Sequence, residues 1–384
     1  MNSREKLGRD EGKSSIRGVA SLVVVIAHAN QIFLLRYFGL DHFSAKLFGQ
    51  LAAQAVMVFF LVSGYLITAS ILKNIHRNAG QFDLLSYSAS RISRIYPPLI
   101  FSVLLCLVIY LVISVFSLPG GHSPYGLSGD LYNTRVAYEV KMTDFLGLLL
   151  MEDGFLQANG PLWSLYIEWR IYIAAGCFAL LVTVKRVSHK ILVGILLMYV
   201  LLGLRKIDPN ALFYAGIWAM GACAALVEIN ASDRLYKVSR YCWMFPVVVL
   251  VCFIASDPYI LLNSWRLSSN WERFFQFASG VLWGALLFRK SWLSDALDKA
   301  TLRWVGNFSY TLYIVHFPLM LMVLSLTQEF VGYSFAISFI VAVSSVLFVV
   351  FLSFFAGRHI EEKERFLPIV RHVLEAIMPL PRRS

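Results

Sequence analysis

Long apolar stretches alternate with short polar segments along nearly the whole chain. A helix needs about 20 apolar residues to cross a bilayer, and ten stretches approach or exceed that length. They cover residues 14–35, 50–72, 98–118, 161–184, 190–204, 211–229, 241–262, 274–288, 305–326 and 333–356. This pattern predicts an all-α fold, a polytopic membrane helix bundle of about ten transmembrane helices.

Three segments fit the pattern less simply. Residues 190–204 and 274–288 are short, so helices there would need tilt or a thinned bilayer. Residues 142–157 are only partly apolar, which is typical of a re-entrant or interfacial segment.

The polar ends predict the domain organisation. We expect residues 1–13 to form a cytoplasmic tail, residues 14–357 the membrane domain and residues 358–384 a second cytoplasmic tail. The triplet Ala-His-Ala at 27–29 looks like a signal-peptidase site. Because the apolar run continues to Leu35, we expect an uncleaved span instead.

Composition and charge support this interpretation. The chain is 58% hydrophobic and 15% charged, which is too apolar for a soluble domain of its length. Of its 34 Lys and Arg residues, 25 lie on the side of the termini when ten spans are assumed. Because basic residues collect in cytoplasmic segments, we expect both termini to be cytoplasmic. The asymmetry also accounts for the net charge of +11 without nucleic acid, for which no binding motif occurs.

The five cysteines lie in apolar stretches and show no CxxC or CxxH spacing. Neither a disulfide framework nor a metal site is therefore expected.

Ionisable residues inside expected spans are usually functional because hydrocarbon disfavours them, and the candidates are His28, Glu168, Arg170 and His316. His28 and Glu168 both lie roughly 10 Å below the outer boundary, so we expect them to meet. Arg170 faces another side of its helix, where we expect it to pair with another group or to line a polar path. His316 precedes Pro318, which frees a backbone carbonyl.

Three arginines lie near the expected cytoplasmic surface. Arg17 opens the first span, and Arg91 and Arg94 share a helix face before the third. Guanidinium groups bind phosphates through paired hydrogen bonds, so these residues are candidates for a phosphate site.

Five motifs follow one another along the chain. They read Arg17-Gly18-x-Ala20 with His28 eleven residues after the arginine, Phe59-Phe60-Leu61-Val62-Ser63-Gly64-Tyr65-Leu66-Ile67, Arg91-Ile92-Ser93-Arg94-Ile95-Tyr96-Pro97, Leu162-Trp163-Ser164-Leu165-Tyr166-Ile167-Glu168, and Gly306-Asn307-Phe308-Ser309-Tyr310-x-x-Tyr313-x-x-His316-x-Pro318. In this order, and over nearly the whole chain, the sequence resembles the acyltransferase-3 family of integral membrane acyltransferases.

The resemblance implies transfer of an acyl group, usually acetyl from acetyl-CoA, to a hydroxyl of a cell-surface or lipid-linked carbohydrate. Acetyl-CoA would be a co-substrate, with no tightly bound cofactor, and membrane lipids would surround the chain in a bacterial cytoplasmic (inner) membrane. By match to the family, His28 corresponds to its essential histidine. Arg17, Arg91 and Arg94 correspond to basic positions that contact the CoA phosphates.

Two departures from the family pattern are visible. The usual Glu-Glu-Gln-Phe-Tyr run is Glu168-Trp169-Arg170-Ile171-Tyr172 here, so a second carboxylate is missing and substrate preference does not carry over. We also expect a single membrane domain, without the extracytoplasmic hydrolase-like domain fused to some members.

Acyl transfer from a thioester to a hydroxyl needs a base that works near neutral pH, and histidine is the usual choice. His28 is therefore the expected base, or a transient acyl carrier if the acetyl group must cross the bilayer. Glu168 is the expected orienter of its ring. Ser63, Tyr310 and Asn307 are candidates for stabilising the oxyanion.

The same residues also have structural interpretations. His28 can be a histidine hydrogen-bonded between helices, and Glu168 a partner of Arg170. Arg91 and Arg94 can be cytoplasmic anchors. Five further positions fit a structural role: His316 can shape a kink or cavity, Ser63-Gly64 allow close helix approach, and Trp163 and Tyr172 fit an interfacial aromatic belt.

Two other functions remain open. A secondary transporter also uses intramembrane His, Glu and Arg to build a proton or substrate path, but the two halves of this chain show no repeat and share no motif. A non-catalytic membrane scaffold would tolerate replacement of His28.

Overall fold

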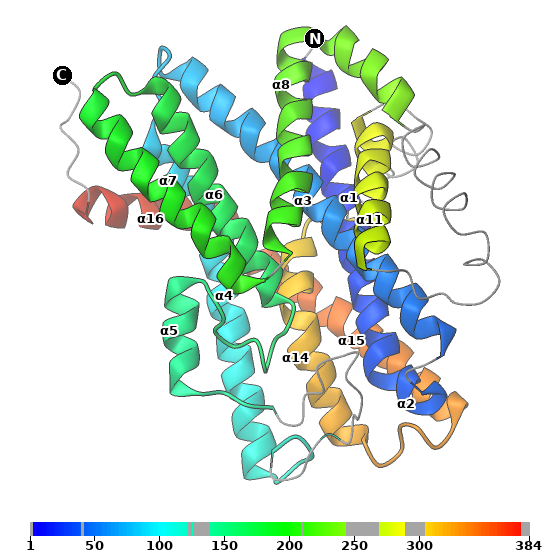
Figure 1. The fold of residues 1–384 in the computed structure, drawn as a ribbon. Coiled ribbons are helices and arrows are strands. Elements are labelled where there is room, and N and C mark those ends of the chain that lie inside the picture. Colours follow the sequence, from blue (N-terminus) through cyan, green and yellow to red (C-terminus); the bar gives the residue numbers. More distant parts are fainter. Residues whose placement is uncertain are drawn as a thin grey trace.

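The computed structural model describes residues 3–39, 42–121, 125, 138–208, 210–242, 269–288 and 304–377; at 3–14, 205, 229–242, 269–275 and 288 it describes the backbone alone. Helices make up all the regular structure in this part of the chain (Figure 1). They are α1 (Ser3–Ala29), the π-helix η1 (Asn30–Leu34), α2 (Leu35–Phe38), α3 (Phe43–Arg77), α4 (Leu84–Val115), α5 (Met142–Leu150), α6 (Leu162–Thr183), α7 (Val187–Ile207), α8 (Ala211–Cys242), α11 (Ser269–Phe288), α14 (Ser309–Thr327), α15 (Phe335–Ile360) and α16 (Lys363–Ile377).

Eight segments of the described chain are long and apolar enough to span a membrane. They lie on α1 to α2, α3, α4, α6, α7, α8, α14 and α15. The expected span 274–288 lies on α11, whose apolar part is shorter, and the expected span 241–262 lies outside the described residues apart from the end of α8. The all-α membrane bundle is confirmed, whereas the orientation of the termini stays a prediction.

Both described ends of the chain are helical. Helix α1 begins at Ser3, so most of the polar segment 1–13 continues the first helix. At the other end α15 continues to Ile360, and α16 then packs against α4.

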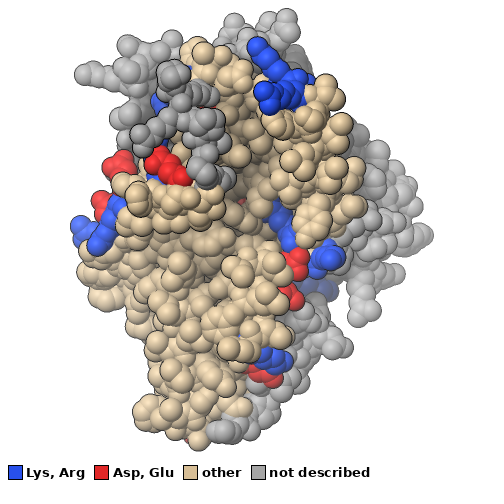
Figure 2. Space-filling model, turned by 90° about the vertical axis from the view of Figure 1, so that its left-hand side faces the viewer, with Lys and Arg blue, Asp and Glu red and all other residues tan. Residues whose placement is uncertain are grey.

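The outer faces of several helices are apolar. On α4 the exposed side chains include Leu104, Val108, Leu111 and Val115, which follow one another at helical spacing. Figure 2 shows that charged residues on one face of the molecule form small groups separated by broad uncharged areas. Such a surface is suited to lipid rather than to water.

Helix α14 lies inside the bundle, between α1, α4 and α15 (Figure 1). Every residue from Ser309 to Leu321 is buried, including polar Ser309, Thr311 and His316. Because the helix has no exposed face over this length, each of its polar side chains faces other helices. Residues of α14 are therefore well placed to contribute to an internal site.

Pro318 lies within α14 and removes one backbone hydrogen bond. The carbonyl oxygen of Ile314, four residues earlier, accepts hydrogen bonds from Ser102 Oγ at 2.9 Å and from Asn159 Nδ2 at 2.6 Å instead. The expected free carbonyl is confirmed, and its partners connect α14 to α4 and to the loop before α6.

Helices α3 and α8 approach each other closely through two glycines. A methyl group at Gly64 would overlap the carbonyl oxygen of Trp218, and one at Gly221 would overlap that of Leu61. Only glycine permits this backbone contact, so the close approach expected at Ser63-Gly64 is confirmed.

Helix α6 begins inside the protein. The loop before it is buried at Ala158 and Asn159, and so is the first helical residue, Leu162. The preceding short helix α5 instead exposes Met142, Leu146 and Leu149. The segment 142–157 therefore runs from an exposed amphipathic helix towards the buried start of a span.

Candidate active site

His28 lies in the last turn of α1, where the backbone continues into the π-helix η1. Its Nδ1 atom lies 2.7 Å from Oε1 of Gln31, a residue of η1. With the amide oxygen as acceptor, Nδ1 carries the proton and Nε2 keeps its lone pair. Single π-turns inside helices often occur at functional sites, and here the π-turn supplies the partner that fixes the histidine tautomer.

His316 packs against His28 from α14. The two ring centroids are 5.2 Å apart, and the edge of Phe317 contacts the His28 ring at 5.0 Å. Nδ1 of His316 lies 3.2 Å from the carbonyl oxygen of Leu312, and its buried Nε2 has no partner within the described part of the chain. Both imidazoles thus have Nδ1 next to an oxygen acceptor, which leaves Nε2 of each ring as the basic nitrogen.

Glu168 accepts hydrogen bonds from two hydroxyl groups. Ser63 Oγ of α3 donates to its Oε1 at 2.7 Å, and Tyr172 of the same helix donates to the same oxygen at 2.5 Å. Ser63 and Tyr172 also contact each other at 3.1 Å. Tyr172 is buried in the protein interior, so its assignment to an interfacial belt is wrong.

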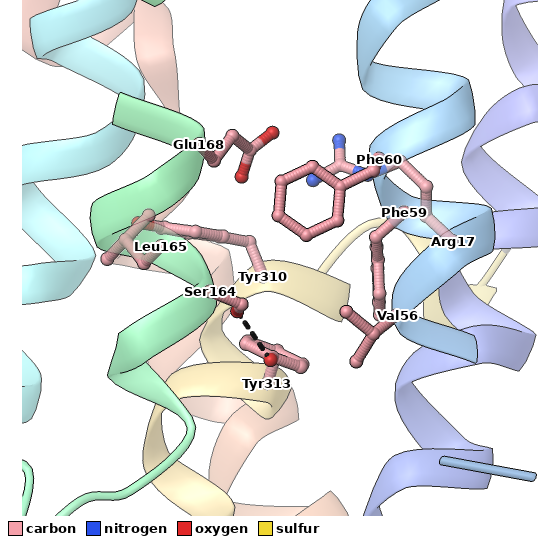
Figure 3. Close-up of a pocket in the computed structure, with 9 residues that line it drawn as sticks. All are labelled: Arg17, Val56, Phe59, Phe60, Ser164, Leu165, Glu168, Tyr310 and Tyr313. Carbon is pink, nitrogen blue, oxygen red and sulfur yellow. Dashed lines mark hydrogen bonds between the residues drawn. The ribbon is translucent and has the colours of Figure 1, made fainter. Parts of the chain in front are cut away.

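A pocket lies between α1, α3, α6 and α14 (Figure 3). Figure 3 shows Glu168 and Arg17 reaching into it from opposite sides, with the ring of Phe60 beside them. At its other end the Ser164 and Tyr313 hydroxyls are hydrogen-bonded at 2.7 Å. Its full lining is Arg17, Val56, Phe59, Phe60, Ser164, Leu165, Glu168, Tyr310 and Tyr313.

The pocket and the histidine pair are adjacent through Tyr313. This residue lines the pocket, and its ring lies 5.9 Å from that of His316. Arg17 lies eleven residues before His28 on α1, about 16 Å along the helix axis. The site thus extends from a charged end at Arg17 and Glu168 to the histidines deeper along α1.

The expected pairing of Glu168 with His28 is not what the described hydrogen bonds show. Glu168 is held by Ser63 and Tyr172, and Nδ1 of His28 is held by Gln31. Glu168 shares the pocket with Arg17 instead.

Arg91 is buried without a carboxylate partner in the described part of the chain. Its Nη2 donates to Ser90 at 2.9 Å, its Nε has no partner, and its cation lies over the rings of Tyr87 and Tyr172 at 5.7 and 6.0 Å. A buried cation of this kind is costly unless an anion neutralises it. Arg91 therefore marks a place where a bound anion would be favourable.

Glu361 is a site residue that the sequence analysis missed. Its carboxylate accepts the backbone N–H of Thr311 in the first turn of α14 at 2.6 Å. Burial raises its pKa to about 7, although the Thr311 N–H and the charge of Arg94 act in the opposite direction. The sequence feature that could have identified Glu361 is the position of its carboxylate just after a long apolar stretch.

The remaining expected residues have structural surroundings. Arg170 forms an ion pair with Glu152 at 2.6 Å, so the expected pairing with another group is confirmed and that partner is not Glu168. The ring of Trp163 packs against Tyr214 at 5.2 Å. Tyr310 lines the pocket, whereas Asn307 is exposed in the turn before α14.

Comparisons with known proteins agree with the sequence motifs. The acyltransferase-3 family model, described as an acyltransferase domain, matches residues 14–357. A protein named peptidoglycan O-acetyltransferase OatA, from Listeria monocytogenes, is 26% identical over 310 residues, which are 71% of this chain and 46% of that protein. An uncharacterised protein of Haemophilus influenzae is 27% identical over 162 residues, 40% of this chain and 60% of that protein.

The curated relatives are matched over only part of their length, whereas the family model is matched over most of this chain. The chain spans about half the length of the curated relatives that it matches, and no solved structure matches it. The family model, however, covers most of the chain, and the described helices are long and apolar enough for a membrane. The chain therefore belongs to the acyltransferase-3 family and is a multi-pass integral membrane protein.

Proposed function

We propose that the chain transfers an acyl group, with acetyl as the expected one, from acyl-CoA to a hydroxyl of a cell-surface or lipid-linked carbohydrate. Membership of the acyltransferase-3 family supports the class of reaction. The name of the Listeria relative, a peptidoglycan O-acetyltransferase, supports a carbohydrate acceptor and an acetyl group.

The observation that carries this proposal is the arrangement of His28 inside the bundle. Gln31 accepts a hydrogen bond from Nδ1, so Nε2 is the basic nitrogen of the ring. In the transfer step the acceptor oxygen attacks the thioester carbonyl carbon while its proton passes to Nε2 of His28. The carbon–sulfur bond then breaks, and the proton moves from His28 to the departing CoA thiolate, so atoms and charges balance.

The histidine also supports a stepwise version of the same reaction. If the acyl group must cross the bilayer before transfer, Nε2 of His28 attacks the thioester carbonyl carbon, the carbon–sulfur bond breaks and CoA leaves as a thiolate. The acceptor hydroxyl then attacks the acyl carbon on His28, the carbon–nitrogen bond breaks, and the hydroxyl proton passes through solvent to the CoA thiolate. Both versions use the Nε2 atom of His28. They differ in whether acylated enzyme accumulates when the acceptor is absent.

The donor binds, in this proposal, at the arginine end of the site. Acyl-CoA carries several phosphate charges, and Arg17, Arg91 and Arg94 supply guanidinium groups that suit them. Arg91 is buried with an unpartnered Nε, so phosphate binding would relieve an uncompensated charge. The acyl chain would then point along the pocket toward the histidines.

The proposal is tested by reconstituting the protein in vesicles with acetyl-CoA labelled in its acetyl group and a membrane glycan extract. We expect label in the glycan fraction, in a form that mild alkali releases because it is an ester, together with an equal amount of CoA thiol. Vesicles without protein give the background. Label that stays in acetyl-CoA, combined with no binding of acetyl-CoA to the protein, would contradict the proposal and favour a transporter.

A further inference from the structure

The short helix α16 at the end of the described chain places a lysine on its packed face. Its half-buried residues are Lys363, Phe366, Leu367, Val370 and Leu374, whose spacing puts them on one side of a helix. Helix α16 packs against α4 (Figure 1), the helix that carries Arg91 and Arg94. Lys363 therefore lies on the buried stripe of α16, together with apolar residues.

The positive charges of Arg91 and Arg94 on α4 affect the pKa of Lys363. Its pKa is lowered chiefly by burial and further by the positive charges of Arg91 and Arg94, while the charge of Glu364 acts in the opposite direction. Because α16 packs against α4, Lys363 lies on the helix next to the one that carries both arginines. Like charges gathered in a partly buried place repel one another unless an anion binds between them.

Neighbouring acidic groups do not supply that anion. Glu361 is hydrogen-bonded to the backbone of Thr311, and its raised pKa of about 7 reduces its charge near neutral pH. Glu364 and Glu375 of α16 lie on its exposed side, where Glu375 pairs with Arg371 at 2.9 Å. Within the described chain Lys363 has no ion pair of its own.

We propose that Lys363 completes, with Arg91 and Arg94, a binding site for phosphate esters, and that its ligand is the phosphate-bearing nucleotide part of the acyl donor. This inference rests on the proposed function for the identity of the ligand. Helix α16 forms one wall of the donor site, and its packing on α4 holds the lysine in place. Membrane lipid phosphates share the same chemistry, so the test must separate the two sources.

The test measures the affinity of free CoA for the full chain in nanodiscs of neutral phosphatidylcholine. We expect Lys363→Gln to weaken CoA binding about fivefold, a typical effect of losing one partly exposed charge contact, and Lys363→Arg to bind nearly as wild type. Lys363→Met, which keeps the length of the side chain, repeats the charge removal if the glutamine variant does not fold.

Arg365→Gln is the matched control, because Arg365 is exposed on the same helix two residues away. Equal weakening by Arg365→Gln and Lys363→Gln would show a general charge effect and overturn the proposal. CoA affinity unchanged by Lys363→Gln would overturn it as well, and so would a loss seen only in nanodiscs that contain phosphatidylglycerol, which identifies a lipid ligand. If CoA binding depends on Lys363 but no acetyl is transferred, this inference stands and the proposed function fails.

Discussion

Glu168 shows how a carboxylate is stabilised between membrane helices. Two hydroxyl groups donate to one of its oxygens, and Arg17 faces it across the pocket. Hydrogen bonds to an ionised acceptor are stronger than neutral ones. The carboxylate thereby connects α3, α6 and the arginine of α1, and its charge is available at the donor end of the site.

We predict that Glu168→Gln lowers acetyl transfer by about 10- to 100-fold. The amide keeps an oxygen that can accept from Ser63 and Tyr172, so the thermal unfolding midpoint should change little. The negative charge opposite Arg17, however, is lost. Glu329→Gln, at an exposed position, serves as the control, and equal transfer by both variants would remove Glu168 from the site.

Glu361 gives the protein a pH dependence of stability. Its pKa is about 7 in the folded protein against an ordinary value of 4.5, so the folded state holds a proton that the unfolded chain has released. Raising the pH from about 4.5 to about 7 therefore lowers the free energy of unfolding, and the loss is complete above about pH 7. The shift corresponds to at most about 3 kcal/mol.

Glu361→Gln should remove most of this dependence, because the amide does not titrate. The measurement is the unfolding midpoint in detergent between about pH 5 and pH 8. We expect the midpoint of the wild type to fall relative to that of the variant as the pH rises. Parallel curves for the two proteins would show that Glu361 is ionised in both states throughout.

At this scale the sequence identifies ionisable groups inside helices but not the residues they pair with. His28, Glu168 and Arg170 were recognisable as ionisable groups in apolar stretches. Gln31 and Glu152, which pair with two of them, lie on a π-turn and in a loop. Hydropathy specifies neither where a helix changes its winding nor which side of it faces a neighbour.

Among the helices, α14 contributes residues both to the pocket and to the histidine pair. It supplies Tyr310 and Tyr313 to the pocket and His316 to the histidine pair. Its proline leaves the Ile314 carbonyl for Ser102 and Asn159, which fixes the helix relative to α4 and the loop before α6. The hydrogen bonds to the Ile314 carbonyl, two residues before His316, therefore help to fix the position of His316.

The contact between α3 and α8 can be tested with two glycines of one helix. Gly221→Ala should destabilise the protein by about 1–3 kcal/mol, because the new methyl group overlaps the Leu61 carbonyl. Gly216→Ala, on the same helix with open space around it, should be neutral or slightly stabilising. Unfolding midpoints of the two variants check this, and equal midpoints would mean that the close approach is absent.

The spans themselves were predictable because each is a long apolar run, and their described helices agree with that pattern. The burial of the loop before α6 was not predictable, because that loop is buried by packing against other elements rather than by lipid. Composition does not distinguish these two ways of burying a residue.

For the whole molecule, the described structure joins an apolar outer surface to a polar interior. Charged and hydroxyl groups from α1, α3, α4, α6 and α14 meet inside the bundle, and α16 adds a lysine at its edge. The sequence predicted this class of molecule through motifs far apart along the chain. It did not predict that Glu168 shares a pocket with Arg17.

The central claim is that His28 performs the transfer of the acyl group. The most direct measurement is the rate of acetyl transfer from labelled acetyl-CoA to glycan in vesicles that hold equal amounts of wild type, His28→Ala and His189→Ala. His189 is exposed on α7, so its variant controls for the loss of a histidine elsewhere. We predict a loss of about 100-fold or more for His28→Ala and a wild-type rate for His189→Ala, whereas wild-type transfer by His28→Ala would contradict the account.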